Sequence, residues 1–232
     1  LTAPMAAGLL TLAAALPMVL NPYYVIVLNS ALVLAIACLG LNLLLGYSGL
    51  LSLGHAAYFG VGAYAGAFLF TFGNMMSLEV HLASGVLAAA GLASVVGLLC
   101  VRATGIFFTI LTLAFAQVVH SLFVSGAVFW PFGEHGKGFF LIYNGGLYIP
   151  RFTIFGADVA PEAFNTAFYY IVLAAFVASV AVMWQLVRTP FGLALRAIRD
   201  NAERAAFIGI PVRQYQWGAF ELSAVFTGLA GG

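Results

Sequence analysis

The sequence predicts an all-α protein, a bundle of helices that crosses a membrane several times. Of its 232 residues, 64% are hydrophobic and only 6% are charged, whereas charged residues make up about a quarter of a soluble domain. Several apolar runs of about 16 residues or more can cross, or nearly cross, a hydrocarbon core of about 30 Å. The chain lacks the alternating pattern of a membrane β-barrel, and helices are the other way to satisfy backbone groups in lipid. A soluble domain is therefore excluded.

Seven apolar segments are predicted to span the membrane, and turn-forming residues separate them. The predicted spans are 5–20, 24–46, 53–72, 80–101, 105–124, 165–187 and 214–232. The first lacks a basic N-terminal region and a second apolar run follows it closely, so it is interpreted as a span and not as a signal peptide. The last is interpreted as an unfinished apolar segment. We therefore expect residues 1–232 to be a single transmembrane domain from a longer protein, with C-terminal spans missing.

The basic residues orient these spans. If each span crosses once, one side of the membrane holds Arg102, Arg188, Arg196, Arg199, Arg204 and Arg213, and the other holds only Lys137 and Arg151. Basic residues concentrate on the cytoplasmic side of membrane proteins. The count therefore predicts a cytoplasmic loop at 189–213 and a long external loop at 125–164.

The cytoplasmic loop is predicted to form one amphipathic helix, from Pro190 to about Ile208. Thr189 is expected to cap its first N–H groups, and Gly209 is expected to end it. Its charged face holds Arg196, Arg199, Asp200, Glu203 and Arg204, with Phe207 projecting beside them, and its opposite face holds Leu195, Ile198, Ala202, Ala205 and Ala206. Three interpretations stay open: a helix lying on anionic lipid, a solvated face, or a docking element for a cytosolic subunit.

A glycine-rich break joins the second and third spans and continues as glycines into the third. Its candidate pathway residues are Gly46, Ser48, Gly49, Ser52, Gly54, His55 and Tyr58. Irregular backbone at membrane depth requires protein or a water-filled cavity around it, and pairs such as Ala56 with Gly60 allow helices to approach closely. The stretch is therefore either a pathway lining or a tightly packed turn, and His55 is expected to be a hydrogen-bonded interior histidine.

Other polar residues within the spans are functional candidates because lipid does not solvate them. Among these, Gln117 and His120 lie in the fifth span, and Glu221 in the last is expected to form a local ion pair near Arg213.

No nucleophile–base pair, metal-ligand spacing or phosphate-binding loop is present in the sequence, so we expect no cofactor and no enzyme activity. Cys38 and Cys100 lie in separate apolar runs and are not expected to form a disulfide.

Three stretches closely resemble the LivM-type permease subunit of branched-chain amino acid ABC importers. They are LNLLLGYSGLLSLGHAAYFGVGAYAGAFL (41–69), RATGIFFTILTLAFAQVV (102–119) and TPFGLALRAIRDNAERAAFIGIPVRQYQWGAFELSAVFTGLAGG (189–232). The resemblance implies a multi-pass permease of the bacterial inner membrane that carries branched-chain or other hydrophobic amino acids. It also implies a second homologous permease, cytosolic ATPase subunits, a periplasmic binding protein and no nucleic acid as partners.

The same resemblance assigns roles to the two segments described above. It favours docking to an ATPase for the 189–213 loop, and it places 46–66 near the translocation path. The sequence departs from the family at 132–139, which replaces a Thr-Gly-Gly-rich motif, and at Glu221, which is usually apolar. Because of the first departure, a urea or short-amide permease stays an alternative. An ion-coupled secondary transporter and a structural membrane subunit are further alternatives.

Overall fold

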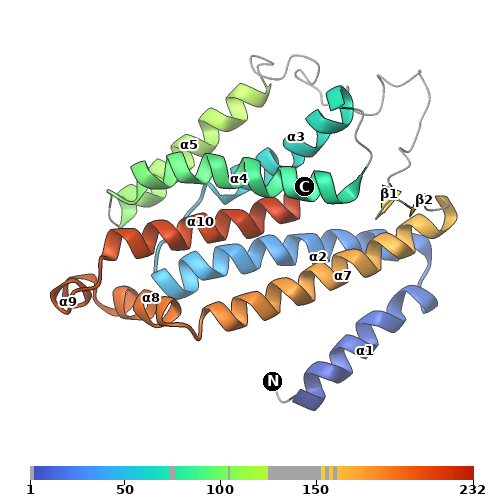
Figure 1. The fold of residues 1–232 in the computed structure, drawn as a ribbon, viewed down its shortest axis with the longest axis horizontal. Helices are drawn as coiled ribbons and strands as arrows, with labels where there is room; N and C mark the ends of the chain where they lie inside the picture. Colours follow the sequence, from blue (N-terminus) through green and yellow to red (C-terminus); the bar gives the residue numbers. More distant parts are fainter. Residues whose placement is uncertain (1–2, 74–76, 104, 125–152, 155–156, 159–160) are drawn as a thin grey trace.

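A computed structural model describes residues 3–73, 77–103, 105–124, 153–154, 157–158 and 161–232, which are almost entirely helical (Figure 1). The helices are α1 (Ala3–Val19), α2 (Pro22–Asn42), the π-helix η1 (Leu43–Ser48), α3 (His55–Gly73), α4 (Leu78–Cys100), α5 (Ile106–Val124), α7 (Pro161–Leu186), α8 (Pro190–Asp200), α9 (Ala202–Phe207) and α10 (Val212–Gly231). Two short strands, β1 (Thr153–Ile154) and β2 (Ala157–Asp158), pair antiparallel. The predicted all-α helical membrane bundle is confirmed, and most of the 125–164 loop lies outside the described residues.

Each predicted span corresponds to a helix. Within the described residues, four are long and apolar enough to cross a membrane: Pro22–Ser48, Leu78–Cys100, Ile106–Phe123 and Asn165–Leu186. Within the same described residues, Leu10–Val19 of α1 forms a shorter apolar helix, and α10 is not among the four. The α10 helix, which carries Arg213 and Glu221, is nevertheless among the most buried elements, since eight of its residues are buried.

Small residues bring α10 into the centre of the bundle, where it packs against α2, α3 and α4 (Figure 1). A Cβ added to Gly62 of α3 would lie 2.7 Å from the carbonyl oxygen of Gly228, and one added to Gly85 of α4 would lie 2.8 Å from the same atom. Three helix backbones therefore meet at Gly228. Such close approach is how helices associate in lipid, where apolar side chains gain little by leaving the solvent.

An aromatic cluster fills the core beside this contact. The Phe220 ring of α10 lies edge-to-face against Tyr58 of α3 at 5.6 Å and against Phe108 of α5 at 5.9 Å between ring centroids. Edge-to-face pairs at this separation add to the area that the rings bury. The cluster fixes the start of α3 and the start of α5 against α10.

The elements that carry the predicted cytoplasmic arginines share one end of the bundle. The α8 and α9 helices, the end of α4 and the start of α10 lie together at the left of Figure 1. We call this the arginine end. It is the end at which η1 and the glycine-rich break also lie, since α8 packs on η1.

The prediction of one helix across the amphipathic loop is wrong, because the helix breaks at Asn201. This residue is extended, with φ −160° and ψ 104°, and its side-chain oxygen accepts a hydrogen bond from the Arg204 backbone N–H at 2.9 Å. Thr189 occupies the cap position of α8 but makes no capping bond; its hydroxyl donates to the Leu186 carbonyl at 2.6 Å. Gly209, with φ +90°, ends α9 as predicted.

The break also changes which residues are buried. Leu195, Ile198 and Ala205 are buried as expected, but Ala202 and Ala206 are exposed. Since α9 starts a new helix after Asn201, its faces are not in phase with those of α8.

Candidate functional site

The glycine-rich break begins where α2 widens into a π-helix. Gly49 follows η1 with φ +73°, in the left-handed region that favours glycine. A Cβ at Gly49 would in addition lie 3.1 Å from Cγ of Arg199. Because π-helical turns depart from the regular hydrogen-bond pattern and often occur at functional sites, this segment is a candidate for conformational change.

The far side of the break packs against α5. A Cβ at Gly54 would collide with the carbonyl oxygen of Thr112. Close by, the Thr109 hydroxyl donates a hydrogen bond to the Leu51 carbonyl at 2.9 Å. The irregular backbone therefore packs against protein on this side.

Two arginines of α8 reach back to the same break. Arg199 Nη1 donates a hydrogen bond to the Gly46 carbonyl oxygen, which belongs to η1. The Arg196 guanidinium carbon lies 5.2 Å from the centroid of the Tyr47 ring, within the range of a cation–π contact. Within this chain both side chains connect α8 to η1, and their predicted contact with a partner subunit stays a prediction.

The remaining members of the predicted coupling set point outward. Asp200, Glu203 and Arg204 are exposed. Phe207 is 90% exposed, and the next residue, Ile208, is 75% exposed. Two adjacent large apolar side chains beside a charged helix face form a compact patch at the arginine end, and solvent alone does not favour such a patch.

The polar residues predicted to line a pathway are buried among α2, α3 and α10. His55 Nε2 lies 2.5 Å from Ser223 Oγ, which donates to the Gly40 carbonyl at 2.5 Å. Because the serine proton goes to Gly40, His55 is the donor to Ser223. His55 is therefore a hydrogen-bonded interior histidine, and Ser223 is a partner that sequence analysis did not identify.

The other members of that set are equally enclosed. The Ser48 hydroxyl donates to the Leu44 carbonyl at 2.8 Å, and Tyr58 belongs to the aromatic cluster. Ser52 Oγ and His55 Nδ1 are buried without a hydrogen-bond partner among the described residues. A direct role of these side chains in a pathway stays a prediction.

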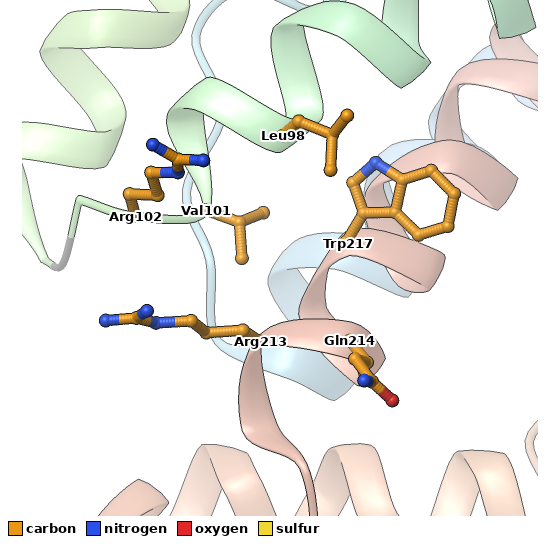
Figure 2. A pocket seen from close by; sticks show the side chains of 6 residues that line it. All are labelled: Leu98, Val101, Arg102, Arg213, Gln214 and Trp217. Carbon is orange, nitrogen blue, oxygen red and sulfur yellow. The ribbon is translucent and has the colours of Figure 1, made fainter.

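Arg102 and Arg213 flank a second feature of the arginine end. They line a cavity of about 260 Å³ with Leu98, Val101, Gln214 and Trp217. Figure 2 shows the two arginines on one side of this cavity, opposite Trp217. Residues separated by more than a hundred positions in the sequence thus lie together, which agrees with the prediction that both face the same side of the membrane.

Glu221 does not have the predicted partner. Its Oε1 accepts a hydrogen bond from Ser94 Oγ at 3.0 Å, and its Oε2 has no hydrogen-bond partner in the described part of the chain. The Trp217 indole N–H points to the same turn of α4, 3.4 Å from the Ser94 carbonyl. The expected ion pair with Arg213 is replaced by a contact between α10 and α4.

Residues 23–232 match the family described as branched-chain amino acid transport system / permease component. A similar protein is the high-affinity branched-chain amino acid transport system permease protein LivM of Escherichia coli (strain K12), 29% identical over 244 residues. The LivM protein of Salmonella typhimurium (strain LT2) is 30% identical over 245 residues. Each alignment covers 97% of this chain and 55% of the relative, so the chain spans about half the length of the curated relatives it matches. No solved structure matches the chain.

Proposed function

This chain belongs to the family of branched-chain amino acid transport system permease components, and from that premise we propose that it forms the translocation pathway of an ATP-binding-cassette importer for branched-chain or other hydrophobic amino acids. The family is one of transport permeases and not of enzymes. The chain is a multi-pass protein of the inner membrane, with four described helices long and apolar enough to span it. Energy for transport would come from ATPase subunits on other chains.

The observation that carries this proposal is the arrangement of α8 and α9. Arg196 and Arg199 attach α8 to the glycine-rich break. The α9 helix that follows exposes Phe207 together with Glu203 and Arg204, and Asp200 at the end of α8 is also exposed. An exposed aromatic anchor surrounded by charges is typical of the centre of a protein interface. A partner that moved this patch would therefore also move the start of the break.

We assign the patch to a cytosolic ATPase, with a second homologous permease and a periplasmic binding protein as further partners. Lipid contact explains arginines at a membrane surface. It does not explain why Arg199 and Arg196 turn to Gly46 and Tyr47 of the same chain while Phe207 is left 90% exposed. Docking accounts for both observations.

Phe207→Ala tests this proposal. A central aromatic anchor contributes about 2 kcal/mol or more to an interface, so the full-length protein carrying this change should lose most of the ATPase that copurifies with it. Leu87→Ala is the matched control, because Leu87 is 72% exposed on α4, away from the arginine end. Equal recovery of ATPase with both variants would contradict the docking role. Leucine uptake by the purified chain alone, driven by an ion gradient, would contradict the whole proposal.

A further inference from the structure

The α5 helix carries two polar side chains at membrane depth although it is the least buried of the four described spans. Gln117 and His120 are both exposed within the span Ile106–Phe123. Gln117 follows Ile106 by eleven residues, which places it about 16 Å along the helix, near the middle of a hydrocarbon core of about 30 Å. Since polar groups at this depth face protein or water and not lipid, this side of α5 is not a lipid surface.

Both side chains line a groove of about 350 Å³ between α3 and α5. Each helix contributes residues at positions i, i+1 and i+4: Ala56, Ala57 and Gly60 on α3, and Ala116, Gln117 and His120 on α5. The volume is at the lower end of the range of small-molecule sites, about 300–1,000 Å³, which are mostly apolar with a few polar groups. The groove has that composition.

The two helices touch at both ends of the groove and separate between them. At the arginine end, Gly54 packs directly on the Thr112 carbonyl. Towards the opposite end, the Tyr64 and Phe123 rings stack with centroids 4.2 Å apart and planes within 8° of parallel. Gly60 lies between these contacts, and a Cβ built on it meets no atom within 4 Å. The absent side chain of Gly60 is therefore open space and not a packing contact, contrary to the sequence expectation that Ala56 and Gly60 allow helices to pack closely.

We propose that this groove binds a neutral amino acid with an aliphatic side chain on its way through the membrane. The inference rests on the proposed function and assigns it a site. The alanines and Gly60 form an apolar wall for the aliphatic side chain, while the amide of Gln117 and the ring of His120 offer hydrogen bonds to the carboxylate and ammonium groups.

The lining also defines what the groove excludes. Among the described residues, its lining includes no aspartate, glutamate, lysine or arginine, so a charged amino-acid side chain would enter without a partner, at a high desolvation cost. Urea and short amides would gain nothing from the apolar wall. Leucine, isoleucine and valine match both parts of the site.

Gly60→Leu tests the groove because the new side chain enters open space. In vesicles containing the full-length protein with its partner subunits, uptake of radiolabelled L-leucine should fall about tenfold or more, as expected when a close-fitting apolar site is obstructed. ATP hydrolysis and subunit composition should persist. Gly91→Leu is the matched control, since a Cβ at Gly91 also meets nothing within 4 Å and this residue is exposed on α4. Normal uptake by Gly60→Leu overturns the proposal, and so does loss of the partner permease, which would make the groove a subunit interface.

A binding measurement without ATP separates this proposal from the importer function. In a background with Cys38→Ser and Cys100→Ser, L-leucine should slow the reaction of Ala116→Cys with a hydrophilic maleimide, and L-glutamate should not. Ala202→Cys is the control, because Ala202 is exposed on α9 at the arginine end and lies outside the groove lining. Protection of Ala116→Cys in a protein that fails ATP-driven uptake would sustain the groove and refute the importer. No protection in a protein that transports leucine would refute the groove alone.

Discussion

Arg199→Ala should lower the amount of transport obtained per ATP hydrolysed. The Arg199 guanidinium donates to the Gly46 carbonyl, and its Cγ lies 3.1 Å from where a Cβ on Gly49 would stand. A hydrogen bond with a charged donor contributes about 1.5–3 kcal/mol net, and the lower end applies because Arg199 is exposed. A loss of about 1.4 kcal/mol is a tenfold change in equilibrium. We therefore expect the population of detached α8 to rise about tenfold.

The assay measures ATP hydrolysis and L-leucine uptake in the same vesicles, containing the full-length protein and its partner subunits. Arg199→Ala should keep ATP hydrolysis and bound ATPase while uptake per ATP falls several-fold. Arg199→Lys, which keeps a charge but not the planar guanidinium, should give an intermediate ratio. Arg204→Ala should instead weaken ATPase binding, because Arg204 lies on the outward face. An unchanged ratio in Arg199→Ala, or loss of ATPase from it as in Arg204→Ala, would refute the reasoning.

Three further predictions concern the bundle itself. Ser223→Ala removes the acceptor of the buried His55 donor, at a cost of about 1–3 kcal/mol for the group left unpaired, and should lower the thermal unfolding midpoint of the detergent-solubilised protein; an unaltered midpoint would argue against this network. Gly228→Leu should leave little correctly folded protein in the membrane, since a Cβ there already collides with α4, while Gly91→Leu should accumulate normally; equal protease resistance of both variants would contradict the packing at Gly228. Glu221→Gln keeps a hydrogen-bond acceptor at its position, so leucine uptake should stay within about twofold of wild type, and loss of uptake with intact folding would instead support a proton relay.

The positions of the spans could be predicted from the sequence. The predicted span 80–101 matches α4 at Leu78–Cys100 to within two residues at each end, and 165–187 overlaps α7 at Pro161–Leu186. Membrane thickness sets the minimum length of such a helix, and each helix satisfies its own backbone. These constraints act within one segment, so they can be read without knowing its neighbours.

The break at Asn201 had a local signal that the helical periodicity obscured. Asparagine is a favoured N-cap, and it caps the turn that ends at Arg204. Arg196, Arg199 and Arg204 share one face when the whole loop is projected as a single helix, so the pattern predicted that they act together. It did not distinguish those that turn inward from those that turn outward, since the Gly46 carbonyl and the Tyr47 ring come from a helix more than 140 residues earlier.

The glycines also separate what the sequence predicts from what the packing of distant helices decides. Gly54, Gly60 and Gly62 are close together in the sequence, yet Gly54 contacts the Thr112 carbonyl, Gly62 contacts the Gly228 carbonyl and Gly60 faces a groove. Composition predicts that such a stretch allows close approach. It carries no information on which glycine meets a backbone, because that depends on the direction from which another helix arrives.

The sequence alone thus determined the membrane class, the helical spans and the side of the bundle on which the arginines gather, because hydropathy and charge act on each segment independently. Only the tertiary structure decided that Arg199 reaches Gly46, that His55 reaches Ser223, and that Gln117 faces a groove beside Gly60. Those contacts join residues that are distant in the chain, and their geometry follows from how α3, α5, α8 and α10 pack together.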